Sequence, residues 1–136
     1  MDLLKSIVAA ASGLRVQSGR MKVISENIAN ADSTRDAPGL DPYRRQVPTF
    51  RGQLDRELGV RTVELGRVKT DTSPFRTRIE PGHPAANANG EVRLPNVNSL
   101  IETMDMREAQ RSYEANLNVI ASARRMISRT IEILRA

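Results

Sequence analysis

The sequence contains no cysteine and no tryptophan, and it has a single histidine. Without cysteine the chain can form neither a disulfide nor a thiolate nucleophile, and it lacks the ligands of a cysteine-rich metal site. A single histidine also excludes a metal motif built on two histidines. Because His83 lies between Gly82 and Pro84 in a predicted turn, we expect an exposed structural residue rather than a general base. We therefore predict no catalytic, cofactor or metal site, and no enzyme.

Long hydrophobic runs are also missing. Charged and polar residues interrupt the apolar start of the chain at Arg15, Gln17, Arg20 and Lys22. The sequence therefore predicts neither a cleaved secretory signal nor a transmembrane helix. If the protein leaves the cytoplasm, we expect it to do so unprocessed. The segment Asn87–Gly90 is not a phosphate-binding loop, because it lacks the lysine and the strand-to-helix context of such loops.

Aromatic residues are scarce, at 3% of the chain, so little material exists for a large core. The net charge of +5 raises the possibility of a nucleic-acid or membrane partner. Basic and acidic residues number 4 and 2 in residues 1–31, 11 and 9 in residues 32–96, and 6 and 5 in residues 97–136. The excess is spread thinly, which favours a soluble surface of mixed charge over a dedicated phosphate-binding patch.

Two apolar stripes with heptad spacing lie at the two ends of the chain. The spacing of alternately three and four residues is typical of helices that pair as a coiled coil. The first stripe comprises Leu3, Ile7, Ala10, Leu14, Met21, Ile24, Ile28 and Ala31, and the second comprises Met106, Ala109, Tyr113, Ile120, Ala123, Ile127, Thr130 and Leu134. We predict an N-terminal coiled-coil helix in residues 1–31 and a C-terminal one in residues 99–136. Each helix is expected to be apolar on one narrow face.

A polar residue interrupts each stripe, Gln17 in the first and Asn116 in the second. A single polar residue in a coiled-coil seam can fix register and partner number at some cost in stability. Alternatively, both residues face solvent where the seam drifts. If Asn116 controls register, Asn116→Leu should stabilise the helices and impair ordered assembly.

The middle segment, residues 32–98, is predicted to be a loop followed by a small irregular β unit. Strands are expected at Val60–Val68, Phe75–Ile79 and Val92–Leu94, the last two forming a hairpin with a long loop. The segment Arg51–Leu58 receives no assignment. The predicted fold class is mainly α with a small β unit.

Helix-end signals differ between the two predicted helices. Asp2 can cap the first helix. Ser99 and Glu102 have the spacing of a capping box, which predicts a well-defined start for the second. Gly13 and Gly19 weaken the first helix by about 1 kcal/mol each relative to alanine. Either packing compensates for this cost, or the segment stays unfolded until it meets a partner.

Several sequence blocks resemble those of the bacterial flagellar basal-body rod proteins. Met21–Ser33, with Asn27, Ala29 and Asn30 at its centre, resembles the N-terminal signature of this family. Further similar blocks follow in the family's order at Tyr43–Gln46, Ser73–Arg76, Pro81–Pro84, Pro95–Asn98 and Arg111–Asn116. The resemblance extends over nearly the whole chain and is closest to the proximal part of the rod.

The resemblance implies a structural subunit that polymerises through its terminal helices into the rod, which crosses the periplasm and transmits torque from motor to hook. It also implies unprocessed export through the flagellar type III apparatus. The implied partners are further copies of the chain and the rod proteins FlgB, FlgF, FlgG and FliE, with no nucleic acid, no membrane insertion and no cofactor. The predicted assembly interface comprises Leu3, Ile7, Leu14, Gln17, Met21, Ile24, Asn27, Ile28, Asn30, Met106, Ala109, Tyr113, Asn116, Ile120, Ile127 and Leu134.

Two other functions are considered. A coiled-coil adaptor would show the same heptad stripes without belonging to a rod. A basic nucleic-acid-binding protein would need basic residues on one helix face, whereas Arg107, Glu108, Arg111 and Glu114 mix the two signs.

Overall fold

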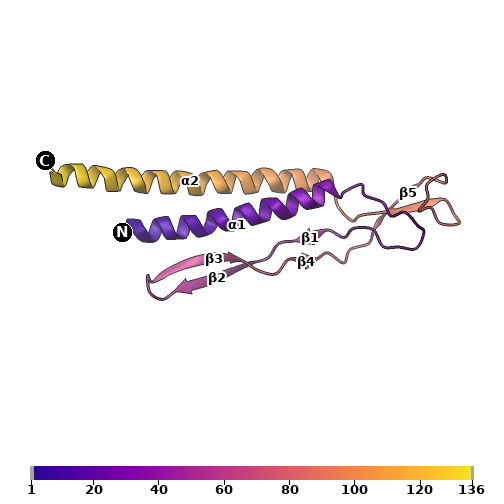
Figure 1. Cartoon of the computed structure of the whole chain (residues 1–136), viewed down its shortest axis with the longest axis horizontal. Coiled ribbons are helices and arrows are strands. Elements are labelled where there is room, and N and C mark those ends of the chain that lie inside the picture. The colour runs from indigo at the N-terminus through magenta and orange to yellow at the C-terminus, as the bar shows by residue number, and fades with distance from the viewer. Residues whose placement is uncertain (1, 136) are drawn as a thin grey trace. The chain divides into compact units, whose positions relative to one another are not determined.

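Two long helices, one near each end of the chain, dominate the structure, which is a computed structural model that describes residues 2–135 (Figure 1). Helix α1 spans Leu3–Ala29 and helix α2 spans Ser99–Arg135. The predicted terminal helices and the predicted fold class, mainly α with a small β part, are therefore confirmed. No helix in residues 2–135 combines the length and the apolarity that a membrane span requires.

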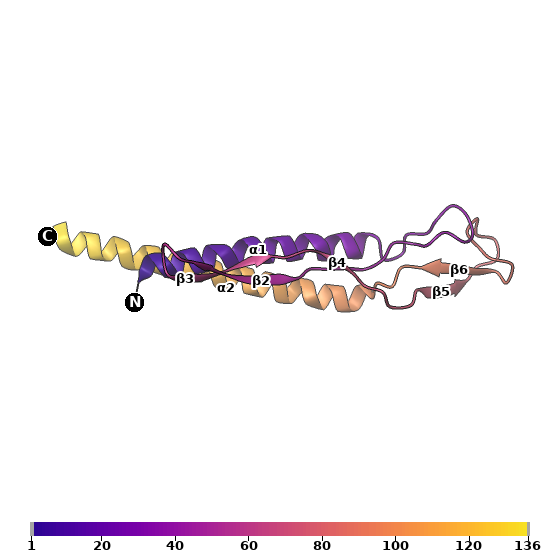
Figure 2. The ribbon, with the colours of Figure 1, turned by 90° about the horizontal axis from the view of Figure 1, so that it is seen from below.

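The middle of the chain forms three separate two-stranded antiparallel ladders, in the pairs β1–β4, β2–β3 and β5–β6 (Figures 1 and 2). The strands are β1 Gln46–Val47, β2 Phe50–Asp55, β3 Val60–Leu65, β4 Lys69–Thr70, β5 Arg76–Ile79 and β6 Glu91–Leu94. The predicted hairpin of the last two strands is confirmed, with Arg76 opposite Leu94 and Ile79 opposite Glu91. The prediction of three strands in all was wrong. Strand β2 lies mostly in Arg51–Leu58, the segment left unassigned, and β1 and β4 are too short to give an alternating pattern.

The chain divides into two compact units, and each helix contributes to both. The first unit consists of Met1–Met21, Pro48–Arg67 and Arg107–Ala136. The second consists of Lys22–Val47 and Val68–Met106. Strands β2 and β3 thus belong to the first unit, and the other two ladders belong to the second.

In the first unit α1 and α2 run antiparallel. A side chain added at Gly13 would meet Asn116, whose Nδ2 would lie 2.7 Å from the new Cβ. About two turns further along α1, and about two turns earlier along α2, Arg20 Nη2 lies 3.7 Å from Glu108 Oε2. Contacts that ascend along α1 and descend along α2 define an antiparallel helix pair, as expected for a seam shared by two helices of one chain.

A second side of α1 packs against the β2–β3 hairpin. The Val63 amide donates a hydrogen bond of 3.2 Å to Ser12 Oγ. A Cβ at Gly19 would lie 2.8 Å from Leu65 Cδ2. Ser12 and Val16 are buried although neither belongs to the predicted stripe. The expectation of one narrow apolar face on α1 was therefore wrong, because a two-stranded hairpin needs cover and finds it on this helix.

The second unit has its apolar core around β6 and the segment that follows it. Val92 and Val97 are fully buried and Leu94 is nearly so. Gly90, in the turn before β6, has φ +76°, a left-handed conformation that glycine adopts without strain. Its neighbour across the turn is Pro81. His83 is half-buried rather than exposed, since its Nδ1 accepts the Ala85 amide at 3.0 Å and its Nε2 lies 3.2 Å from Thr34 Oγ1.

Both helix starts are capped, but one of them not as predicted. Asp2 Oδ1 accepts the Leu4 amide at 3.1 Å, which confirms the cap of α1. At α2 the capping residue is Asn98, whose Oδ1 accepts the Leu100 amide at 3.0 Å. The prediction that Ser99 and Glu102 form a capping box was therefore wrong. Glu102 is 1% exposed and its carboxylate turns into the second unit.

Candidate assembly site

Asn27, near the C-terminal end of α1, is the centre of a buried polar network in the second unit. Its Nδ2 donates to the Gln46 carbonyl at 2.8 Å, and its Oδ1 accepts the Gln46 amide at 2.9 Å. The side-chain amide therefore pairs with the backbone of β1 as a neighbouring strand would. Asn27 is 1% exposed, so both backbone groups would lack a partner without it.

Two further side chains reach Asn27 from other parts of the second unit. The Tyr43 hydroxyl donates to Asn27 Oδ1 at 2.9 Å, and Asn27 Nδ2 also lies 3.0 Å from Glu102 Oε2. Burial, and then the negative charges of Glu26 and Glu102, raise the pKa of Tyr43 above its ordinary value. The phenol is thereby held in the neutral form that donates to Asn27.

Arg45 neutralises the buried Glu102 carboxylate. Its Nε donates to Glu102 Oε1 at 2.6 Å, a charge-assisted bond. Its other nitrogens lie 3.7 Å from Asp71 and 3.7 Å from Asp105. The pKa of Arg45 is raised, because the hydrogen bond and the charge of Glu102, helped by Asp71 and Asp105, outweigh the opposing effect of burial. We call Asn27, Tyr43, Arg45, Gln46 and Glu102 the Asn27 network.

Asp71 extends this network towards the loop after β4. Its Oδ1 accepts the Ser73 amide at 2.8 Å. That bond, followed by one from the Ser73 side chain and the charge of Arg45, lowers the pKa of Asp71. Asn96 joins the two ends, because its Oδ1 accepts the Arg45 amide at 2.8 Å and its Nδ2 donates to Ser73 Oγ at 2.9 Å. The blocks that carry the family resemblance at residues 27, 43–46, 73 and 95–98 thus meet in one unit.

The predicted interface residues fall into three groups by exposure. Ile24, Asn27 and Ala109 are buried, and Leu134 is 81% exposed. The remaining residues are half-buried: Leu3, Ile7, Leu14, Gln17, Met21, Ile28, Asn30, Met106, Tyr113, Asn116, Ile120 and Ile127. Most of the seam is therefore shielded within the chain, and its last position is open. Its role in assembly stays a prediction.

Neither polar seam residue is fully exposed. Gln17 has a buried Oε1 without a hydrogen-bond partner among the described residues, and Asn116 Nδ2 donates to the Ser112 carbonyl of its own helix at 3.0 Å. A buried acceptor without a partner costs about 1–3 kcal/mol. A polar seam residue that sets the register of a coiled coil is expected to lower stability in this way. The hypothesis that Gln17 and Asn116 set the register stays a prediction.

Sequence reasoning missed Arg45 and the role of Glu102. The sequence did contain a signal for Glu102. When the heptad stripe of α2 is continued towards the N-terminus, the stripe position before Met106 is Glu102. A charged residue in a seam position requires a buried partner. Local spacing gave no way to find that partner, since Arg45 lies 57 positions away in the sequence.

Two family models match the chain, one in each terminal region. The model described as "Flagella basal body rod protein" matches residues 7–35, which include Asn27. The model described as "Flagellar basal body rod FlgEFG protein C-terminal" matches residues 88–133, which include Glu102.

Curated relatives match over nearly the whole chain. The flagellar basal-body rod protein FlgC of Agrobacterium fabrum is 53% identical over 127 residues, which cover 93% of this chain and 91% of the relative. The FlgC proteins of Borreliella burgdorferi and Salmonella typhimurium are 38% and 37% identical, each with 98% of this chain covered and with 99% and 98% of the relative covered. These relatives do not favour the adaptor or the nucleic-acid-binding alternative. The chain therefore belongs to the FlgC family of flagellar basal-body rod proteins, and it is a structural subunit of the rod rather than an enzyme.

Proposed function

We propose that this rod subunit polymerises through its terminal helices and thereby transmits torque from motor to hook. The observation that carries the proposal is the surface of α2 in the first unit, where large apolar side chains remain open to solvent. They are Leu117, Val119, Met126, Ile131, Ile133 and Leu134, each at least 44% exposed. Large apolar side chains that stay exposed together on one helix are typical of an interaction site.

The predicted interface residues contribute to assembly in two steps in this proposal. The apolar seam positions that are buried or half-buried, from Leu3 to Ile24 and from Ala109 to Ile127, first pair α1 with α2 within a subunit. The open positions beyond them then meet neighbouring subunits. The partners are further copies of the chain and the rod proteins FlgB, FlgF, FlgG and FliE. We also propose that the chain has three functional parts, residues 1–31, 32–98 and 99–136. The two terminal helices assemble with other subunits, and the middle part faces the outside of the rod.

The Asn27 network supports a mechanical role. It joins the last turns of α1, the extended segment before β1 and the first turns of α2 by hydrogen bonds that are largely shielded from water. Bonds to charged groups are worth about 1.5–3 kcal/mol each when shielded in this way. In a subunit that carries load, these hydrogen bonds add cross-connections to the packing of the seam.

We further propose that the chain is exported without a cleaved signal, through the flagellar type III apparatus, and that the rod it joins lies in the periplasm. The early interruption of the apolar start by Arg15, Gln17 and Arg20 supports unprocessed export. The absence of cysteine suits a chain that passes from a reducing to an oxidising compartment.

Isolation of detergent-extracted basal bodies tests whether the chain is part of the rod and whether it is exported unprocessed. Intact-mass measurement should find the full-length, unprocessed polypeptide in the basal-body fraction. The matched control is the same fraction from cells that lack the gene. Recovery of the chain in the cytoplasm alone would contradict the rod assignment, and recovery of a shortened chain would contradict unprocessed export.

A further inference from the structure

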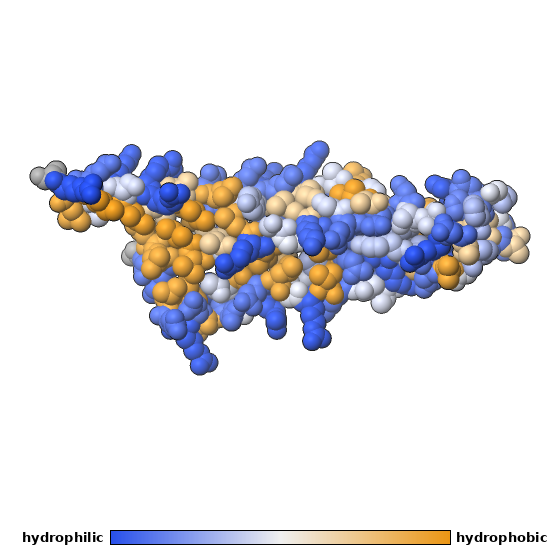
Figure 3. Space-filling model, in the orientation of Figure 1, coloured by the Kyte–Doolittle hydropathy of each residue, from blue (hydrophilic) through white to orange (hydrophobic). Residues whose placement is uncertain are grey.

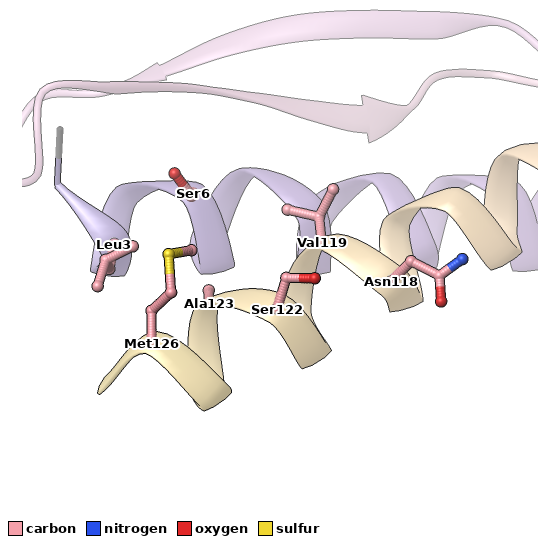
Figure 4. A pocket seen from close by; sticks show the side chains of 7 residues that line it. All are labelled: Leu3, Ser6, Asn118, Val119, Ser122, Ala123 and Met126. Carbon is pink, nitrogen blue, oxygen red and sulfur yellow. The ribbon is translucent and has the colours of Figure 1, made fainter. Parts of the chain in front are cut away.

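The apolar features of the first unit belong to the surface that the proposed function uses. Figure 3 shows hydrophobic surface gathered over this unit, and Figure 4 shows the groove between α1 and α2 that Leu3, Val119 and Met126 help to line. The second unit holds a feature of a different kind in the loop between β5 and β6. This loop contains Asn89 followed by Gly90, the one Asn–Gly pair in the sequence.

An asparagine followed by glycine is prone to deamidation, because glycine has no side chain to keep its backbone nitrogen away from the asparagine side chain. In this reaction the glycine nitrogen attacks the asparagine Cγ, and the new C–N bond closes a succinimide ring. The Cγ–Nδ2 bond breaks, and the proton of the glycine nitrogen leaves with Nδ2 as ammonia. Water then opens the ring to aspartate or isoaspartate. The net change consumes a water molecule and replaces an amide by a carboxylate.

The two reacting residues lie in different surroundings. Asn89 is exposed, and its side chain makes no hydrogen bond among residues 2–135, so its Cγ is free to turn towards the backbone. Gly90 is buried, and its N–H donates to the Asn87 carbonyl at 2.9 Å. Its carbonyl accepts the Glu80 amide at 2.8 Å. The attacking nitrogen is therefore held in a turn, while the carbon that it attacks is free.

The Asn87 side chain holds the same turn from within. Its Oδ1 accepts the Asn89 amide and the Glu91 amide, each at 2.9 Å. The Asn87 amide in turn donates to the Glu91 carbonyl at 3.0 Å, which joins the two ends of the turn. Pro81 packs on its other side, since a Cβ at Gly90 would lie 3.0 Å from Pro81 Cγ. The loop must open before the Gly90 nitrogen can leave Asn87 and reach Asn89 Cγ.

We propose that Asn89 is a site of spontaneous deamidation, and that the folded loop between β5 and β6 protects it. Chains whose second unit is open are modified, and folded chains are spared. Isoaspartate adds a carbon to the backbone before the buried Gly90, whose φ of +76° belongs to the closed turn, so a modified chain refolds this loop less well. Position 89 thereby records how long a chain has been unfolded. The inference goes beyond the proposed function and does not depend on it.

Peptide mapping of the purified full-length chain tests the proposal. Trypsin cuts after Arg78 and Arg93, so the peptide of residues 79–93 contains Asn89 together with Asn87, which precedes alanine and is the internal control. In concentrated urea at mildly alkaline pH, Asn89 should deamidate faster than Asn87. Without urea, at the same pH and temperature, Asn89 should react at least about tenfold more slowly. The synthetic peptide of residues 79–93, measured in both media, corrects for any effect of urea on the chemistry.

Equal rates at Asn89 in the two media would overturn the protection. An Asn87 rate in urea that matches the Asn89 rate would overturn the assignment of the site. Neither result bears on the rod assignment, because the chemistry concerns a single chain.

Asn87→Ala gives a second test without urea. It removes the Oδ1 that holds the Asn89 and Glu91 amides, and it keeps the backbone carbonyl that holds Gly90. Deamidation of Asn89 should become about fivefold faster in the folded chain, because the loop opens more often, and should not change in urea. Asn30→Ala is the matched control, since it makes the same change in the same unit outside this loop. An Asn87→Ala chain that reacts no faster than the control would contradict the proposal.

Discussion

At the scale of single residues, Asn27 has the most consequential position in the chain. Helix α1 ends at Ala29, and β1 begins at Gln46. Between them the chain needs a group that can satisfy backbone donors and acceptors in a buried place. An asparagine side chain carries one acceptor and two donors in the arrangement of a peptide group. Aspartate, of the same size, would leave the Gln46 carbonyl without a donor.

Asn27→Ala should lower the free energy of unfolding by about 3 kcal/mol, because it removes bonds to Gln46, Tyr43 and Glu102 and leaves buried polar groups without partners. Urea unfolding followed by circular dichroism measures this change. Asn30→Ala is the matched control, since among residues 2–135 Asn30 Nδ2 donates only to the Glu26 carbonyl of its own helix, at 2.8 Å. Equal losses in the two variants would show that the Asn27 network contributes nothing.

Tyr43 makes the second unit sensitive to alkaline pH. Its pKa in the folded chain is raised by burial, so the neutral phenol is stabilised. This stabilisation is fully present below the unfolded pKa, about 10, and is lost as the pH rises through the higher folded pKa. Tyr43→Phe should cost about 1 kcal/mol at neutral pH. Urea titrations from pH 7 to 12 should show the two proteins converging in stability at high pH. A constant difference between them would contradict this assignment.

At the scale of the elements, the glycines of α1 have a packing explanation. Gly13 faces Asn116 on α2 and Gly19 faces Leu65 on β3. Each allows a neighbouring element to approach more closely than a side chain would permit. Of the two interpretations considered for this helix, the structure supplies the packing that offsets its weakness.

A double-mutant cycle separates helix propensity from close packing at Gly13. Gly13→Ala alone should gain little or lose stability, because the new methyl group would lie 2.7 Å from Asn116 Nδ2. In an Asn116→Ala background the same change should stabilise by about 1 kcal/mol, the intrinsic preference of a helix for alanine. The difference between the two effects, from thermal unfolding of the four proteins, is the coupling energy. Additive effects would show that the two residues do not contact each other.

Heptad spacing predicted both helices correctly, because the same repeat continues over many turns and is not typical of strands or loops. The first residue of α2 was harder to predict, since Asn98 and Ser99 are adjacent and both residue types cap helices well. Ser99 was predicted as the cap because Glu102 follows it at the spacing of a capping box. In the structure Glu102 instead accepts the charge-assisted hydrogen bond from Arg45. Strand β2 has an exposed apolar face, with Phe50 at 46% and Leu54 at 56%, and Gly52 between them hides its alternation.

Part of the candidate site was likewise visible in the sequence. The stripes predicted one shielded face on each helix, with Ala10 and Ile24 buried on α1 and Ala109 and Ala123 buried on α2. They did not predict the second shielded face of α1, which packs on the β2–β3 hairpin. The resemblance named Asn27, but nothing local revealed that it pairs with the backbone of Gln46. Such a bond depends on how the loop after α1 returns to the helix. Long-range contacts of this kind have no periodic signature.

At the scale of the whole molecule, a subunit whose helices each enter two units is sensitive to charge in the seam. Ile120→Asp should abolish swimming, because it places a carboxylate in the half-buried face of α2. Export into the medium should continue. Ala121→Asp, one position along on the exposed side, should leave swimming intact. Motility plates and immunoblots of culture supernatants measure both effects, and normal swimming of the Ile120→Asp strain would contradict an assembly role for the seam.

The pairing of Asn27 with the backbone of Gln46 has a consequence for hydrogen exchange. Strand β1 has two residues, and amide protons in so short a ladder ordinarily exchange with solvent quickly. The Gln46 amide instead donates to the side-chain oxygen of the buried Asn27, so we expect it to exchange only when the second unit opens. The Gln46 amide proton, which we expect to exchange slowly for so short a strand, therefore serves as a native reporter. Its exchange rate measures how often the second unit opens, in the unmodified chain and without any label.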